Sequence, residues 1–210
     1  MNGNYVINIG RQIGSGGKKI GEIISRSLGI SLYDKELINL AAEESGFSPE
    51  LFEHADEHRS RGALTSLIGY LRIPFAGDDG GATDVLSGDA LFKIQSDVIR
   101  KIADRESCIF VGRCADYILR ENSRTVNVFI TADSEDRQKR ICSRMGVTPQ
   151  EALSVMERGD ERRASYYNYY SSHKWGAAAT YHLCVNSSVL GLEGTAEMII
   201  DFARRKLGNV

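Results

Sequence analysis

Five runs of apolar, mostly β-branched residues recur along the chain, and each ends at or next to a glycine or a polar residue. The runs cover residues 5–10, 30–34, 108–113, 125–131 and 182–188. Because they are nearly continuous rather than alternating, they predict strands that are covered on both faces, as in a parallel sheet.

Segments with the spacing of amphipathic helices alternate with these runs. One of them carries Ile20, Ile24 and Leu28 on a single helical face, and it ends at Gly29, the expected C-terminal cap. Helices are predicted at 17–28, 89–104, 134–146, 149–174 and 193–208. Strands that alternate with helices indicate an α/β fold in which helices cover both faces of a parallel sheet.

The stretch from residue 35 to residue 105 interrupts this alternation. Helices are expected at 35–46 and 48–58, and residues 74–89 are rich in glycine and aspartate with no hydrophobic period. We expect the latter to be a mobile surface segment. Whether residues 77–88 close over a substrate is left open.

Length and charge narrow the class of protein. A chain of 210 residues is typical of one α/β domain with an inserted lobe, and a net charge of −2 gives no overall attraction to nucleic acid or to an anionic membrane. No apolar run approaches the roughly 18 residues that span a bilayer. Scattered cysteines and the absence of a signal-peptide profile predict a soluble protein of the reducing cytoplasm. The sequence does not indicate an oligomeric state.

The loop "GRQIGSGGKKIG" at 10–21 follows the first strand and opens the first helix. Inward-facing amides and the positive end of a helix make phosphate its natural ligand. The match to G-x-x-x-x-G-K-[ST] is partial, because Gln12 takes the first glycine position and Lys19 the hydroxyl position. A plain turn is the alternative, but it would need fewer glycines. Polar residues that follow the other strands are expected to converge beside this loop.

The motifs "GRQIGSGGKKIG", "LYDKELI", "CIFVGRCADYIL", "DERRASYYNYYSSHKWG" and "YHLCVNSSVLG" together resemble the cytidylate-kinase-like family of P-loop proteins, from Val6 to about Leu207. The resemblance implies a three-layer P-loop NTPase sandwich with a five-stranded parallel sheet. Its core would be 1–34 and 106–210, its helical monophosphate-binding insert 35–105, and its arginine-rich lid about 137–175. The implied activity transfers the γ-phosphate of ATP to a nucleoside monophosphate such as CMP or dCMP, with Mg²⁺.

The resemblance also implies roles for individual residues. The triphosphate cradle would be Gly14, Ser15, Gly16, Gly17, Lys18 and Lys19. The acceptor would face Asp34, Lys35, Arg113 and Asp116. The catalytic group would comprise Lys18 and Arg113 with Arg140, Arg158 and Arg163 as phosphate contacts, oriented by Asp160. The alternative for the lid is a solvated pair of helices whose charges neutralise each other. Its aromatic run 166–175 is expected to pack the lid onto the domain, a stacked base being the alternative.

The loop departs from the family pattern in two places. Gly17 takes the place of the phosphate-loop lysine, and Lys19 takes the place of the hydroxyl that binds Mg²⁺. Since lysine does not ligate a cation, Ser15 or water would have to serve. Three hypotheses therefore stay open: a monophosphate kinase in which Lys18 or Lys19 replaces the missing lysine, a nucleotide-binding protein with little or no turnover, and a kinase for a different small acceptor.

Overall fold

The computed structural model describes residues 3–34 and 88–208. Internal contacts divide the chain into two compact units, Met1–Asp34 with Ile99–Val210, and Lys35–Val98. The helices predicted at 35–46 and 48–58, and all but the end of the predicted mobile segment at 74–89, lie outside the described residues. Helix α5 (Gly88–Arg105) confirms the helix predicted at 89–104.

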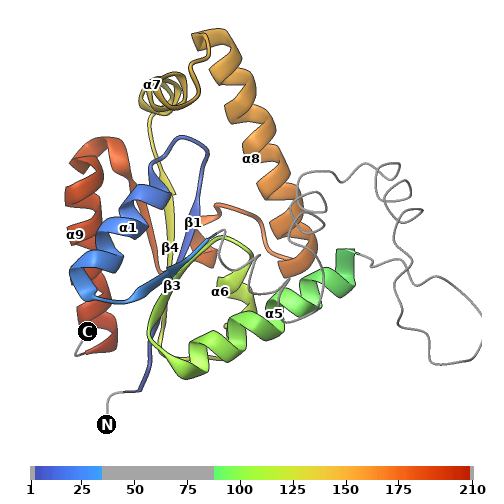
Figure 1. Cartoon of the computed structure of the whole chain (residues 1–210), viewed down its shortest axis with the longest axis vertical. Helices are drawn as coiled ribbons and strands as arrows, with labels where there is room; N and C mark the ends of the chain where they lie inside the picture. The colour runs from blue at the N-terminus through green and yellow to red at the C-terminus, as the bar shows by residue number, and fades with distance from the viewer. Residues whose placement is uncertain (1–2, 35–87, 209–210) are drawn as a thin grey trace, which may run out of the picture. The chain divides into compact units, whose positions relative to one another are not determined.

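A five-stranded parallel sheet forms the centre of the first unit (Figure 1). Its strands are β1 (Val6–Arg11), β2 (Ser31–Tyr33), β3 (Cys108–Val111), β4 (Thr125–Thr131) and β5 (Leu183–Asn186). They pair in the order β2-β3-β1-β4-β5, every pair parallel. This confirms the predicted α/β fold, and it brings the carboxyl ends of all five strands to one edge.

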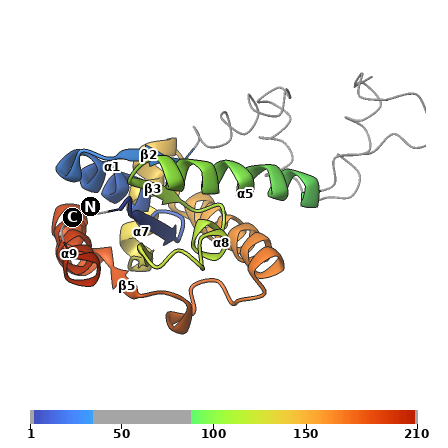
Figure 2. The same cartoon turned by 90° about the horizontal axis from the view of Figure 1, so that it is seen from below.

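Helices α1 (Gly17–Leu28) and α9 (Ser187–Leu207) lie side by side on one face of the sheet (Figures 1 and 2). Their buried isoleucines, Ile20 and Ile199 among them, pack on Ile7 and Ile9 of the central strand. Helix α1 ends as predicted, with Gly29 in the left-handed conformation at φ 65°.

The last helix begins at Ser187, six residues before its predicted start at 193. The side chain of Asn186 caps it by accepting a hydrogen bond from the backbone N–H of Ser188 at 2.9 Å. A kink at Gly191, at φ 69°, then breaks the hydrophobic period between this first turn and the rest of the helix. The period from which the helix was predicted therefore starts only after the kink.

Aromatic side chains cover part of the other face, where the short helix α6 (Ala115–Ile118) follows β3. The ring of Phe129 lies 5.1 Å from the ring of Trp175 and 5.0 Å from that of Tyr181, measured between centroids. Tyr167 is buried and donates its hydroxyl to Asp116 at 2.6 Å. Two residues of the aromatic run, Tyr167 and Trp175, therefore pack against the sheet domain.

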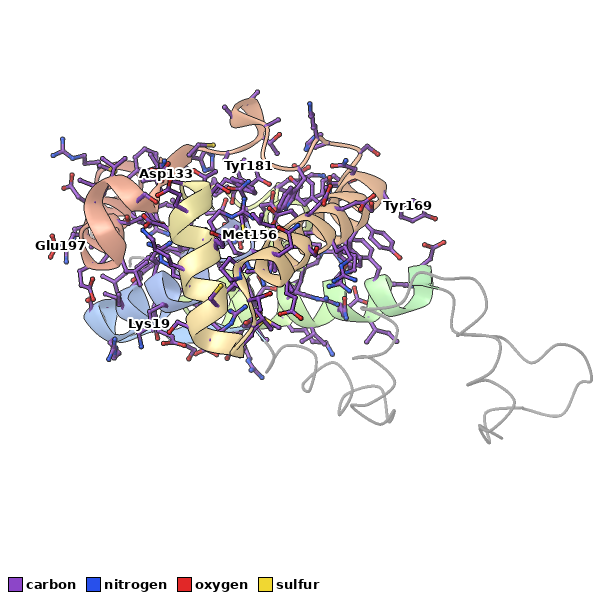
Figure 3. The ribbon with its side chains drawn as sticks, turned by 90° about the horizontal axis from the view of Figure 1, so that it is seen from above. Lys19, Asp133, Met156, Tyr169, Tyr181 and Glu197 are labelled. Carbon is purple, nitrogen blue, oxygen red and sulfur yellow. The ribbon has the colours of Figure 1, made fainter. Side chains whose placement is uncertain are left out.

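Helices α7 (Ser134–Met145) and α8 (Pro149–Ser171) form a hairpin beyond the carboxyl end of β4 (Figure 1). The hydroxyl of Thr148 and the side chain of Glu151 cap the start of α8 reciprocally. Met156 lies between the two helices (Figure 3) and, with Ile141, forms a small core against which Ile13 packs. The hairpin thus rests on the loop that follows β1.

No helix in the described ranges 3–34 and 88–208 is long and apolar enough to cross a membrane.

Candidate phosphate-binding site

The loop between β1 and α1 depends on two glycines in the left-handed conformation. Gly14 has φ 76°, and Gly16, the residue before α1, has φ 79°. A Cβ atom on Gly14 would lie 2.7 Å from the carbonyl oxygen of Arg137. Both the backbone conformation and the close approach of α7 therefore require glycine at position 14.

Side chains from three helices hold the carbonyl groups of this loop. Arg137 donates from Nε to the carbonyl of Ile13 at 2.7 Å, and Arg140 donates to that of Gly14 at 3.2 Å. The hydroxyl of Ser187 donates to the carbonyl of Ser15 at 2.7 Å, and Arg163 donates to that of Arg11 at 2.9 Å. The donors come from α7, α8 and α9, so the carbonyl side of the loop is closed.

The amide side of the loop faces the other way. In a trans peptide the C=O and the following N–H point in opposite directions, so the N–H groups of Gly14 and Gly16 point away from these donors. In the described part of the chain, neither N–H donates to another backbone group. The amides at the start of α1 have no partner within their own helix, and they carry its partial positive charge. The loop thus presents several amides to an anion.

Cationic side chains gather at the same edge of the sheet. Arg11 and Lys18 each place a nitrogen 3.5 Å from a carboxylate oxygen of Asp34. Burial lowers the pKa of Arg11, and Asp34 opposes that shift. Burial also lowers the pKa of Arg163, and the neighbouring charge of Arg11 lowers it further. Each of these guanidinium groups would gain from an anion placed beside it.

Asp160 and Arg137 together fix the backbone of Ile13. The Asp160 carboxylate accepts a hydrogen bond from the N–H of Ile13 at 2.7 Å, and its other oxygen pairs with the guanidinium of Arg137. Gly159, the residue before Asp160, lets α8 approach the loop closely, since a Cβ atom on Gly159 would lie 2.5 Å from the Ile13 side chain. The loop is therefore clamped from outside by α7 and α8.

The structure brings some of the predicted site residues to the loop. Asp34, Arg140, Asp160 and Arg163 lie within hydrogen-bond or ion-pair distance of the loop or of Arg11, and Lys18 pairs with Asp34. Through the donors described above, Arg140 and Arg163 bond to loop carbonyls. Phosphate contact for either residue stays a prediction.

Other predicted residues lie elsewhere. Arg158 is exposed, and its Nε donates to the carbonyl of Ser154 in its own helix at 3.2 Å. Lys19, labelled on α1 in Figure 3, is 57% exposed and pairs with Glu22 at 3.1 Å. Lys35 lies outside the described residues. These contacts join neither the Arg158 guanidinium nor the Lys19 ammonium to the other residues of the site.

Arg113 and Asp116 both follow β3, Arg113 in the turn after the strand and Asp116 in α6. The guanidinium carbon of Arg113 lies 5.2 Å from the centroid of the Tyr166 ring. Asp116 accepts the hydrogen bond from Tyr167. Burial raises the pKa of the Asp116 carboxyl group, and this hydrogen bond lowers it by a smaller amount. Asp116 is half-buried, and a carboxyl group with a raised pKa near a strand end is a candidate for a functional position.

Three residues of the site had no individual role assigned from the sequence: Arg11, Arg137 and Ser187. Arg11 and Ser187 nevertheless lie where polar residues were expected to converge. Arg137 shares a helical face with Arg140, so helical spacing alone could have included it. Ser187 directly follows β5, where polar residues were expected to converge. Arg11 ends β1, but nothing in the local pattern distinguishes it from a surface arginine.

The described residues do not fit a directly coordinated Mg²⁺. The Ser15 hydroxyl, the predicted ligand, is fully buried and donates to the carbonyl of Gln12 at 2.9 Å. Lys19 occupies the other hydroxyl position. Among the residues that the structure describes, no group of three or more His, Cys, Asp or Glu side chains could hold a metal ion.

Solved structures with the same architecture include kinases. An uncharacterised protein from Eubacterium ventriosum superposes with a TM-score of 0.72 at 27% identity, over 95% of this chain and 98% of that one. A shikimate kinase from Bacteroides thetaiotaomicron gives 0.52 at 12% identity, over 98% and 99%. Shikimate kinase from Acinetobacter baumannii in complex with shikimate gives 0.52 at 13%, over 99% and 97%. The last two show the fold alone, and no curated protein matches the chain.

The family is shown by the sequence as a whole. Residues 6–189, which include the loop, the five strands and the α7–α8 hairpin, match the profile of the cytidylate kinase-like family. The chain has the kinase-like fold, and it belongs to the cytidylate kinase-like family.

Proposed function

We propose that the protein is a nucleotide-binding phosphotransferase that moves the γ-phosphate of ATP to a nucleoside monophosphate such as CMP or dCMP. The observation that carries this proposal is the loop, whose carbonyls are held by α7, α8 and α9 while the N–H groups of Gly14 and Gly16 face the opposite way. Membership of the cytidylate kinase-like family supports the same activity.

Each part of the site has a physical task in this reaction. Phosphoryl transfer needs little covalent chemistry from the protein, since positioning and stabilisation of the phosphate charge supply most of the catalysis. The loop amides and Lys18 would hold the triphosphate. Arg163, which lies over the carbonyl of Arg11, would face the transferring group. Arg113, at the end of β3, would meet the acceptor phosphate.

The described residues offer no hydroxyl or carboxylate set for a resident Mg²⁺, so no step here depends on a metal that the protein holds. If Mg²⁺ takes part, it enters with ATP as part of the substrate. Cations outnumber carboxylates among the described residues around the loop: Arg11, Lys18, Arg137, Arg140 and Arg163 against Asp34 and Asp160. This excess supports phosphate binding independently of a metal.

Two other functions each have an observation in their favour. A glycine at the position of the phosphate-loop lysine favours a protein that binds nucleotide with little or no turnover. A kinase for another small acceptor is favoured by the fold shared with shikimate kinases. The acceptor would in either kinase depend on the unit Lys35–Val98, most of which lies outside the described residues.

A coupled assay of ADP release over a panel of acceptors separates these functions. The panel contains CMP, dCMP, UMP, AMP and shikimate, and calorimetry measures ATP affinity in parallel. Turnover with CMP or dCMP is expected. ATP binding without turnover would select the binding protein, and turnover with another acceptor alone would select the third function. Arg163→Met is expected to abolish turnover, whereas Arg205→Met, which removes an exposed charge from α9, is the matched control.

A further inference from the structure

The space beside Gly17, where the loop departs from the usual phosphate-loop motif, is filled by the side chain of Arg11. Gly17 stands at the position of the phosphate-loop lysine. A Cβ atom on Gly17 would lie 2.7 Å from the Cβ of Arg11 and 2.9 Å from its Cγ. Since real side-chain atoms do not approach so closely, position 17 has no room for a lysine while Arg11 takes this path.

A second glycine lies at the far end of the Arg11 side chain. A Cβ atom on Gly112, the residue after β3, would overlap the guanidinium group of Arg11. Gly112 also has φ 83°, a conformation that other residues rarely adopt. Beyond it, Nη2 of Arg11 lies 3.5 Å from Oδ1 of Asp34. Arg11 therefore runs past two glycines and is held by a carboxylate at the end of β2.

The two lysines of the loop are held less firmly. The side chain of Arg11 is 18% exposed, whereas those of Lys18 and Lys19 are 51% and 57% exposed. Lys19 pairs with Glu22 on its own helix. Lys18 reaches the same carboxylate as Arg11, but at its other oxygen. A cation that is fixed in advance stabilises a phosphate better than one that must first be ordered.

We infer that Arg11 replaces the missing phosphate-loop lysine, so that its guanidinium is the fixed cation for the terminal phosphates of a bound nucleoside triphosphate. The inference rests on the proposed function and names the residue on which its triphosphate site depends. A guanidinium binds phosphate with two parallel hydrogen bonds, which a lysine does not do. Asp34 orients Arg11 from the opposite side. Because burial lowers the pKa of Arg11, a bound phosphate would favour its charged form.

The first test removes the charge and keeps the unbranched stem of the side chain. Arg11→Met is expected to weaken ATP binding, measured by calorimetry, by about ten- to a hundredfold. Arg26→Met, on the exposed side of the last turn of α1, removes the same charge at a position away from the loop and is expected to bind ATP as the wild type does. Circular dichroism confirms that each variant is folded.

The second test moves the cation back to the helix. Gly17→Lys alone is expected to bind ATP no better than the wild type, because its side chain collides with Arg11. Combined with Arg11→Gly, which removes both atoms that a Cβ at position 17 would meet, Gly17→Lys is expected to recover at least tenfold of the affinity that Arg11→Gly alone loses (about 1.4 kcal/mol). If Arg11 has a purely structural role, the double variant recovers no affinity. This comparison still tests the role of Arg11 if Arg11→Met does not fold.

Failure of the inference is distinct from failure of the proposed function. If the wild type binds ATP and Arg11→Met binds it equally well, or if Lys18→Met loses the affinity instead, the inference is wrong and the proposed function stands. If the wild type binds neither ATP nor pyrophosphate, the proposed function fails, and the role of Arg11 falls with it.

Discussion

Asp160 accepts a hydrogen bond from the backbone N–H of Ile13 at 2.7 Å, although 147 residues separate the two. The same carboxylate pairs with Arg137, which donates to the carbonyl of Ile13. Both polar groups of one loop residue are therefore held by one ion pair between α7 and α8. This links the position of the hairpin to the shape of the loop.

Asp160→Asn is expected to lower the free energy of unfolding by about 2–4 kcal/mol, because the 10% exposed Arg137 side chain would keep its charge without its partner. Urea denaturation at pH 7 measures the change. Asp201→Asn breaks an exposed pair with Arg205 and is the matched control, expected to cost less than about 1 kcal/mol. Equal losses for the two variants would show that Asp160 does not act as a clamp.

Gly14→Ala is expected to damage both stability and ATP binding, since the new methyl group meets the backbone of Arg137. Gly29→Ala is the matched comparison, because Gly29 is also left-handed, at φ 65°, but has nothing within 4 Å of a Cβ. The control is expected to cost about 1–2 kcal/mol and to leave ATP affinity unchanged. Calorimetry measures the ATP affinity of both variants, and urea denaturation measures their free energy of unfolding. Together they separate the cost of backbone strain from damage to the loop. Normal ATP binding by Gly14→Ala would contradict the loop geometry described here.

The strands and α1 could be predicted from the sequence because their signals are local. A buried strand is a short apolar run, and Gly29 ends α1 through its own backbone conformation. The start of α9 could not be predicted from periodicity, because the side chain of Asn186 and the kink at Gly191 determine it. The hydrophobic pattern predicts only the part of that helix that packs on the sheet.

The site was harder to predict, because its residues are selected by packing between distant elements. Helical spacing places arginines on α7 and α8, but it does not say which face meets the loop. That face is fixed by Gly159, where α8 approaches Ile13, so Asp160 and Arg163 reach the loop while Arg158 faces solvent. The role of Arg11 could not be recognised from the local pattern, since the space that its side chain fills is left by Gly17 in α1 and by Gly112 after β3.

Pyrophosphate is expected to stabilise the protein, because it would neutralise guanidinium groups whose pKa values burial lowers. At about a hundredfold excess over its dissociation constant, the melting temperature should rise by about 5–10 °C. Sodium chloride at equal ionic strength should give a much smaller rise. Thermal unfolding of the wild type and of Arg163→Met measures this, with a smaller shift expected for the variant. A shift no larger than that with chloride would mean that the loop binds no anion.

Asp116 gives stability a pH dependence of known sign. Burial raises the pKa of its carboxyl group above the ordinary value of 3.8, so the folded state favours the protonated form. Its contribution to stability is therefore fully present below pH 3.8, and it is lost as the pH rises through the raised pKa of the folded protein. Asp116→Asn stays neutral, and its amide oxygen still accepts the hydrogen bond from Tyr167.

We therefore expect Asp116→Asn to be more stable than the wild type at pH 8, with a difference that shrinks as the pH falls toward 4. Each unit by which the pKa is raised corresponds to about 1.4 kcal/mol of this difference. Urea denaturation of both proteins from pH 4 to pH 8 measures it, and a difference that is constant with pH would show that Asp116 does not titrate in this range. Because Asp116 is also a proposed acceptor contact, the more stable variant is expected to lose turnover with CMP. A carboxylate that lowers stability at neutral pH but is needed for turnover would be there for the reaction rather than for the fold.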